Sequence, residues 1–300
     1  MRARVVGWLV AIGLSALVLV ISRVPATHAA PLLRLATNGG VVDHTSRWRM
    51  QVFSRTPLPK VDNLAMHRDG SLYATLEMWY IGRVMRIDRR GIGRPVLKYL
   101  QRPDGLSLVK DTLYIAEERE RGRIIQFNLV TKQRRLLFRT HNPEGIAQFD
   151  EQHLVLTEDI PGGRLLLLRK ADGAIKVLLR GLQRPEGICV ATDRSIYIAE
   201  TLTGRILKYS MASQSATVLI TGLIEPDQVK CHPDGSLWIT EDRDPDGRLL
   251  RYHNNKLYLI ATNLRSPQGI TFDPQGNVYV AEQENARIIK LTPNPGHPPF

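Results

Sequence analysis

Residues 185–206 read PEGICVATDRSIYIAETLTGRI, and this stretch decides the fold. A short apolar run follows Pro185, a turn surrounds Asp193, and a second run from Ile196 to Ala199 is closed by Glu200. Runs of β-branched and aromatic residues separated by turn residues are typical of paired β-strands. Arg205 opens a third run, so the stretch predicts three successive strands.

The same pattern occurs six times along the chain. The first residues of the copies are separated by 42, 40, 42, 41 and 41 positions, and a fourth run, such as Lys176 to Leu179, completes each copy. Four short strands in a repeat of about 41 residues are the signature of a propeller blade. The six starts are Val61-Asp62-Asn63-Leu64, Pro103-Asp104-Gly105-Leu106, Pro143-Glu144-Gly145-Ile146, Pro185-Glu186-Gly187-Ile188, Pro226-Asp227-Gln228-Val229 and Pro267-Gln268-Gly269-Ile270.

The phase of the repeat predicts how the ring closes. The chain enters the first copy with a fourth-strand-like segment, Trp48 to Phe53, and ends the last copy after a third strand, Arg287 to Leu291. We therefore predict an all-β, six-bladed β-propeller of four-stranded antiparallel blades, in which the N-terminal strand joins the last blade. The repeats cover residues from about 47 to 292. The predicted domain is 47–300, and residues 30–46 form a linker.

The acid that closes the second run is predicted to be structural. A Glu occupies this place in five copies, and in every copy an Arg opens the third run. Features repeated in every blade rarely perform unique chemistry, so Glu–Arg pairing is the favoured interpretation. The first copy differs, because Leu76 replaces the Glu and is followed by Glu77-Met78-Trp79-Tyr80.

The second residue of each start is the candidate site. The first strand of a blade is innermost, so these six side chains are expected at one mouth of the central channel. Crowded carboxylates repel unless a cation or protons intervene, and Ca²⁺ accepts about 6–8 oxygen ligands in irregular cages. Capping of loop amides is the alternative. The six residues are Asp62, Asp104, Glu144, Glu186, Asp227 and Gln268.

Further side chains are candidates for binding a substrate at this mouth. Trp79 and Tyr80 could stack on a substrate or pack on their own blade. Arg102 and Arg184 directly precede two of the starts, where they could orient an anionic group or remain solvated. His141 lies two residues before Pro143, where it could reach the mouth or be ordinary surface. There is no G-x-S-x-G sequence for a nucleophilic serine.

The N-terminal segment predicts export. Arg2 and Arg4 precede a run from Val5 to Ser22 without a charge, and a small-residue stretch ends at Ala29. This is the pattern of a signal peptide over residues 1–29, with an uncleaved anchor as the alternative because the run approaches the length of a membrane span. Both interpretations predict an extracytoplasmic protein, periplasmic or secreted, that contacts a membrane only through this segment if it is retained.

The charge balance favours anionic partners without naming one. The chain carries a formal charge of +12, and loss of the three arginines of residues 1–29 leaves +9. Export argues against nucleic acid as the anionic partner.

The chain has only two cysteines, Cys189 and Cys231, and their spacing is not that of a metal-ligand motif. We therefore expect no disulfide framework and interpret both most simply as small buried hydrophobic residues, and the sequence leaves open whether they are bonded to each other.

The repeated Pro-Asp/Glu-Gly-Ile start, the Asp-Gly hairpin and the Gly-Arg-Ile segment resemble the SMP-30/gluconolactonase-like and NHL-repeat propellers. Glu284-Asn285-Ala286-Arg287-Ile288 is similar to the NHL signature. The resemblance to SMP-30-like lactonases implies one divalent metal, held at the mouth by a Glu, an Asn and an Asp. By that resemblance Asp227 is the Asp ligand, and Asp62 or Asn63 is the ligand of the first blade. The family's Asn falls where this chain has Glu144 and Glu186.

Two hypotheses about function follow. The first is a metal-dependent hydrolase, acting on a small-molecule lactone or ester, with Asp227 as ligand and general base and with one divalent ion, best matched by Ca²⁺. The second is a non-catalytic NHL-type module that binds an anionic ligand or a protein on the mouth face. The Glu in place of the family's Asn favours the non-catalytic module, because an additional charged ligand makes a bound cation less able to polarise a substrate carbonyl.

Overall fold

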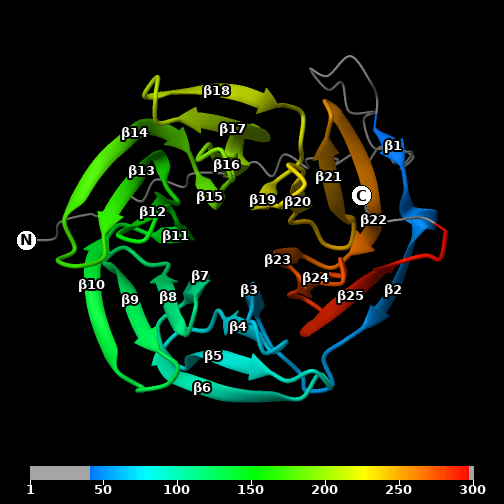
Figure 1. Ribbon diagram of the computed structural model, residues 1–300, viewed down its shortest axis with the longest axis horizontal. Helices are drawn as coiled ribbons and strands as arrows, with labels where there is room; N and C mark the ends of the chain where they lie inside the picture. Colours follow the sequence, from blue (N-terminus) through cyan, green and yellow to red (C-terminus); the bar gives the residue numbers. More distant parts are fainter. Residues whose placement is uncertain (1–40, 297–300) are drawn as a thin grey trace, which may run out of the picture. The chain divides into compact units, whose positions relative to one another are not determined.

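The computed structural model describes residues 41–296, and these form six β-sheets arranged as a ring (Figure 1). The predicted signal peptide or anchor, residues 1–29, lies outside the described residues. Within residues 41–296, no helix is long and apolar enough to cross a membrane. The predicted all-β, six-bladed propeller with antiparallel blades is confirmed.

Each blade begins at the axis with an inner strand that pairs with a second strand. The inner strands are β3 (Val61–Met66), β7 (Pro103–Val109), β11 (Pro143–Gln148), β15 (Pro185–Val190), β19 (Pro226–Cys231) and β23 (Pro267–Phe272). The second strands are β4 (Leu72–Leu76), β8 (Thr112–Glu117), β12 (His153–Glu158), β16 (Ile196–Glu200), β20 (Leu237–Glu241) and β24 (Val278–Glu282).

Two further strands complete each blade toward the outside. The third strands are β5 (Gly82–Ile87), β9 (Gly122–Asn128), β13 (Pro161–Arg169), β17 (Arg205–Ser210), β21 (Gly247–His253) and β25 (Arg287–Pro293). The fourth strands are β6 (Gly93–Leu100), β10 (Arg134–Thr140), β14 (Ile175–Gln183), β18 (Ser215–Ile220), β22 (Lys256–Leu264) and β2 (Trp48–Val52).

The ring closes through β2, as predicted. This strand pairs antiparallel with β25, from Trp48 opposite Pro293 to Val52 opposite Ile289. The predicted linker also contains a short strand, because β1 (Val42–Asp43) pairs in parallel with β22 of blade five. Two short 3₁₀ helices, η1 (Thr45–Arg47) and η2 (Thr201–Thr203), complete the described elements.

The hydrophobic core lies between neighbouring blades. One cluster joins Leu64 and Leu72 of blade one to Tyr279 and Ile288 of blade six. Corresponding clusters join the other blades, so each sheet is covered on both faces. This explains why most strands read as continuously apolar rather than alternating.

The inner strands approach one another so closely that most starts require glycine. A Cβ atom on Gly105 would lie 1.8 Å from the carbonyl oxygen of Glu144, and one on Gly145 would lie 2.3 Å from that of Glu186. A glycine inside a strand often marks such a backbone approach.

Every inner strand also has a register shift between its first and fourth residues. This bulge frees the second residue from the ladder, and bulges characteristically re-aim a side chain.

The Glu that closes the second strand is structural, as predicted. Each one pairs with the Arg that opens the third strand, and each also accepts a hydrogen bond from the end of the preceding blade, for example from the backbone N–H of Gln183 to Glu200 at 2.8 Å. These carboxylates are at most 1% exposed. The pairs are Glu117–Arg123, Glu158–Arg164, Glu200–Arg205, Glu241–Arg248 and Glu282–Arg287.

The simplest interpretation of the cysteines, as plain buried hydrophobic residues, is wrong, and the open question of a bond between them is answered by the structure. Cys189 of β15 and Cys231 of β19 form a disulfide with a Cα–Cα distance of 5.6 Å. They lie 42 residues apart, about one repeat, and so occupy nearly equivalent positions on the inner strands of neighbouring blades. The bond fastens blade four to blade five beside the axis.

Ring closure predicts the effect of removing β2. Deletion of residues 46–55 should abolish the cooperative thermal transition measured by circular dichroism, because it leaves β25 without its partner. Deletion of residues 41–45 is the control, since it removes only the two-residue strand β1. An unchanged transition after deletion of residues 46–55 would refute the closure.

Loss of the disulfide should lower the free energy of unfolding by about 2–4 kcal/mol, because the bond closes a long loop in the unfolded chain. The measurement is denaturant unfolding of the double variant Cys189→Ser/Cys231→Ser beside the oxidised protein. Coincident unfolding curves would show that the bond contributes nothing.

Candidate functional site

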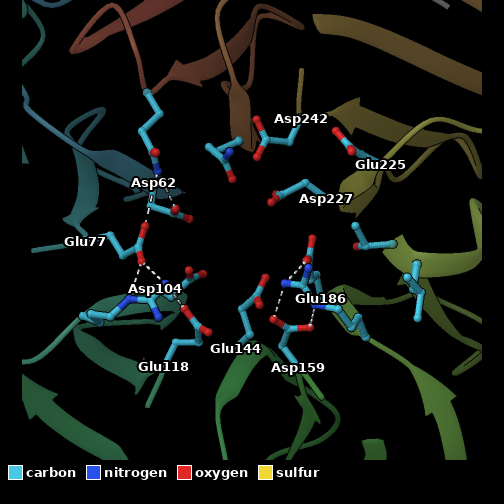
Figure 2. A pocket seen from close by; sticks show the side chains of 16 residues that line it. Asp62, Glu77, Asp104, Glu118, Glu144, Asp159, Glu186, Glu225, Asp227 and Asp242 are labelled. Carbon is cyan, nitrogen blue, oxygen red and sulfur yellow. Dashed lines mark hydrogen bonds and ion pairs between the residues drawn. The ribbon is translucent and has the colours of Figure 1, made fainter. Parts of the chain in front are cut away.

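A cavity of about 470 Å³ opens at one end of the channel. The six predicted mouth positions all line it: Asp62, Asp104, Glu144, Glu186, Asp227 and Gln268. Figure 2 shows the labelled acids pointing inward from different blades around a common space. Each of the six is 7% exposed or less. The repeat alone therefore located this inner ring of side chains.

A second ring of polar side chains surrounds the first, and the sequence analysis did not assign it. Each of its residues directly follows a second strand, and its backbone N–H donates at 2.8–3.0 Å to the carbonyl of the residue that precedes an inner strand. Those preceding residues have positive φ angles of 38–53°, a left-handed conformation that turns the chain sharply into the next blade. The second ring is Glu77, Glu118, Asp159, Thr201, Asp242 and Gln283, all of which line the cavity.

A sequence signal for this ring existed. In three copies an acid directly follows the closing Glu, as in Glu117-Glu118, Glu158-Asp159 and Glu241-Asp242. Because the second strands end on the mouth side of the ring, the residue directly after the closing Glu is a natural candidate for the mouth.

Two arginines partly neutralise the mouth. Arg102 forms ion pairs with Glu77 and Glu118. Arg184 donates to Asp159 at 2.6 and 2.9 Å and to Glu186 at 3.1 Å. Both line the cavity, as the sequence suggested, but their guanidinium groups are already engaged by carboxylates.

Four residues that the sequence analysis put forward do not line the cavity. Asn63 occupies the glycine position of its start and is buried, and its backbone N–H donates to Thr75. His141 is exposed. Trp79 and Tyr80 are 54% and 70% exposed, and the guanidinium of Arg102 lies 5.4 Å from the Trp79 ring centre. Trp79 is thus adjacent to the cavity lining without forming part of it.

The surroundings of the inner carboxyl groups disfavour their charged forms and so raise their pKa values. Burial, followed by repulsion from Glu186 and Asp242, raises the pKa of Asp227 well above its usual range. Burial and neighbouring acids likewise raise the pKa values of Asp62, Asp104 and Glu144. Burial raises the pKa of Glu186 to about 8, with Asp159 adding repulsion, and raises that of Glu118 to about 7 despite Arg102.

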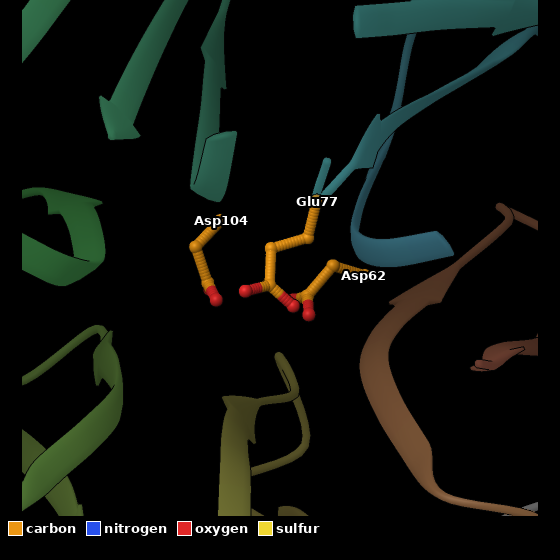
Figure 3. A group of neighbouring side chains, drawn as sticks. All are labelled: Asp62, Glu77 and Asp104. Carbon is orange, nitrogen blue, oxygen red and sulfur yellow. The ribbon is translucent and has the colours of Figure 1, made fainter. Parts of the chain in front are cut away.

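The donor set fits a hard divalent cation. The carboxylates of Glu144, Glu186 and Asp227 offer oxygens that lie within 4.8 Å of one another. A separate group with the same spacing consists of Asp62, Glu77 and Asp104 (Figure 3). Oxygen-only ligands with several carboxylates are typical of Ca²⁺ and Mg²⁺ sites. The mouth combines ten carboxylates with two guanidinium groups, so a bound cation would relieve a large excess of negative charge.

The fold and its mouth define a six-bladed propeller with an acidic central cavity. The family model described as SMP-30/Gluconolactonase/LRE-like region matches residues 143–294, just over half of the chain. The chain belongs to this family, as its repeats suggested. No curated protein is similar enough in sequence to match it.

Solved structures share the fold at low sequence identity. A gluconolactonase from Xanthomonas campestris has 13% identity and a TM-score of 0.71 over 83% of this chain and 91% of its own. A streptogramin B lyase has 16% identity and a TM-score of 0.62 over 83% and 99%. A catalytically inactive histidine-to-alanine variant of virginiamycin B lyase from Staphylococcus aureus, solved with quinupristin, has 16% identity and a TM-score of 0.61 over 82% and 99%.

The raised pKa values predict how the cation-free protein responds to pH. The folded state binds more protons than the unfolded state between the ordinary Glu pKa of 4.5 and about 8, so the free energy of unfolding should fall as pH rises through this window. Ca²⁺ should therefore raise the thermal midpoint more at about pH 8.5 than at about pH 5.5, because it binds the ionised carboxylates.

Thermal melts with chelator and with Ca²⁺ at both pH values test this. The variant Glu186→Gln serves as the control, since it removes one of the titrating carboxyls and should weaken the pH dependence. A larger effect of Ca²⁺ at the acidic pH would contradict the interpretation of the mouth.

Proposed function

We propose that this protein is an exported hydrolase that opens a lactone or ester at the propeller mouth with the help of a divalent cation, best matched by Ca²⁺. The observation that carries the proposal is the buried group Glu144, Glu186 and Asp227, whose carboxylates meet within 4.8 Å inside a cavity of about 470 Å³. Membership of the SMP-30/Gluconolactonase/LRE-like family supports the reaction class.

Glu144, Glu186 and Asp227 would hold the cation. The carboxylates of Glu144 and Asp227 accept no hydrogen bond within residues 41–296, so their oxygens remain available as ligands. Arg184 holds Glu186 from the other side. A bound divalent cation supplies Lewis acidity, which polarises the carbonyl of a substrate.

Asp227 is the proposed general base. Its carboxylate lines the cavity beside Glu144 and Glu186, where it can reach a water that attacks the substrate. In the reaction, a water oxygen bonds to the acyl carbon while the acyl carbon–oxygen bond of the lactone or ester breaks. Asp227 takes a proton from the water and delivers it to the leaving oxygen, which becomes a hydroxyl group.

The substrate is expected to enter past Trp79. The cation–π contact with Arg102 fixes this ring next to the cavity, and its 54% exposure leaves a face free for apolar contact. Arg102 and Arg184 are positioning residues in this scheme, because carboxylates of the mouth engage both guanidinium groups.

Export is supported by two independent features. The first is the charge and hydropathy pattern of residues 1–29. The second is the Cys189–Cys231 disulfide, because disulfides persist mainly in oxidising compartments outside the cytoplasm. A periplasmic or secreted location is therefore proposed.

Hydrolysis is preferred to a lyase reaction because of the cavity lining. The virginiamycin B lyase variant named above is inactive when a histidine is replaced by alanine. Among the described residues that line the mouth cavity here, none is histidine, and the groups able to carry protons are carboxylates. The lining thus favours a reaction assisted by carboxylates and a cation.

One observation favours a second candidate, a non-catalytic binding module. Glu144 and Glu186 stand where the resemblance to SMP-30-like lactonases places a neutral Asn, and additional anionic ligands make a bound cation a weaker Lewis acid. Such a module would bind its ligand at the same mouth without turnover.

Hydrolysis assays distinguish the two candidates. The purified protein should hydrolyse lactones or aryl esters in the presence of Ca²⁺, lose the activity with chelator, and regain it when Ca²⁺ is returned. Asp227→Ala should lower kcat/KM by at least about 100-fold, because it removes both a ligand and the base. The exposed Glu151→Gln is the control variant. Full activity in Asp227→Ala would end the proposal, and bound metal without turnover would favour the binding module.

A further inference from the structure

The central channel has a second cavity at the end opposite the mouth. It has a volume of about 350 Å³, and all six inner strands, which surround the axis in Figure 1, contribute to its lining. Each strand contributes only residues from its fourth position onward, whereas the mouth contains the second residue of each strand. The two cavities therefore lie at opposite ends of the inner strands.

The two ends of the channel differ in charge. Ten carboxylates line the mouth, whereas Lys230 is the only charged side chain among the described residues that line the opposite end. Most of these residues are apolar, among them Met66, Leu108, Val190 and Phe272. The inner strands are also edge strands of their sheets, so backbone N–H and C=O groups on their inner edges face the axis.

Lys230 interrupts the repeat. It is the fifth residue of β19, and the other inner strands have neutral and smaller side chains at this position. A lysine costs more free energy to enclose than any of these side chains, because its ammonium group loses hydration. The packing that all blades share therefore does not account for it. The five equivalent residues are Ala65, Ser107, Ala147, Cys189 and Thr271.

The ammonium group of Lys230 has no carboxylate to compensate its charge. It forms no ion pair and donates no hydrogen bond within residues 41–296, although its side chain is only partly exposed. Enclosure by the surrounding strands lowers the pKa of Lys230, and no neighbouring acid opposes this shift. Charged side chains that proteins enclose are as a rule paired, so this ammonium group is suited to an anion from outside the protein.

The disulfide holds the wall of the cavity beside Lys230. Cys231 directly follows Lys230 in β19, and both Cys231 and Cys189 line the cavity. Their bond joins the inner strands of blades four and five. A wall that is fixed before binding reduces the conformational entropy that a ligand must remove.

We propose that this cavity binds a small carboxylate with an apolar body, such as a medium-chain aliphatic acid, whose carboxylate pairs with the ammonium group of Lys230. Hydrogen bonds between an ammonium and a carboxylate are among the strong ones in proteins. A water molecule takes about 30 Å³ in the liquid, so 350 Å³ accommodates a ligand of about ten non-hydrogen atoms. The site is separate from the mouth and does not depend on the proposed function.

Isothermal titration calorimetry of the full chain, freed of divalent cations, tests the proposal with octanoate. The wild-type protein should bind one octanoate per chain, at least about tenfold more tightly than uncharged 1-octanol, because only the acid pairs with Lys230. Octanoate should also bind at least about tenfold more tightly than acetate, because the longer chain buries apolar surface. Lys230→Met should lose the preference for octanoate over 1-octanol, and Lys230→Arg should retain it.

The control variant is Lys176→Met, which removes the same charge from an exposed position of β14 and should bind octanoate as the wild type does. Thermal melts check folding, and Lys230→Gln replaces Lys230→Met if that variant does not fold. Equal affinity for octanoate in the wild type and in Lys230→Met would overturn the proposal, as would a wild-type protein that binds no octanoate. Equal affinity for octanoate and acetate would overturn the apolar part of the site.

Discussion

The close approach of six inner strands around one axis is the constraint on which the rest of the structure depends. It leaves no room for a side chain where Gly105 and Gly145 face the backbone of the next blade. The bulge that accompanies these glycines frees the preceding residue from the ladder. Asp104 and Glu144 can then turn only toward the axis, where they meet the acids of the other blades. Packing thus concentrates charge at the mouth.

The charge concentration is tolerated because the stability of the ring comes from elsewhere. Apolar clusters fill the spaces between neighbouring blades. The buried Glu of each Glu–Arg pair also accepts a hydrogen bond from the end of the preceding blade, as Glu117 does from Gln101 and Glu200 from Gln183. The Cys189–Cys231 bond adds a covalent link beside the axis. These contacts hold the inner strands in place although their carboxylates repel one another. A cation at the mouth would bind with a smaller free-energy cost, because the fold has already brought its ligands together and the cation removes their mutual repulsion.

Much of the fold and part of the site could be predicted from the sequence, because a repeat reports equivalent positions. The spacing of the starts located all six inner strands, and the phase of the last copy identified Trp48 to Phe53, which contains β2, as the closing segment. The inner ring followed directly, since ring symmetry carries Asp62 and Asp227 to the same opening.

What the sequence could not predict depends on contacts between blades. The sequence left open whether Cys189 and Cys231 are bonded, because their separation of 42 residues becomes a contact only when neighbouring inner strands lie side by side. Asn63 looked like a ligand, but it occupies the position where four of the other five copies have glycine, away from the cavity. The engagement of Arg102 by Glu77 and Glu118 depends on a loop conformation that no residue spacing specifies.

The central claim is that packing gathers these carboxylates into a site that requires a cation. The most direct measurement is anomalous diffraction from crystals grown with Mn²⁺, a hard cation that prefers the same oxygen ligands. The account predicts an anomalous peak inside the mouth, among the carboxylates of Glu144, Glu186 and Asp227. A mouth without a peak at saturating Mn²⁺, with its carboxylates unmoved, would contradict the account.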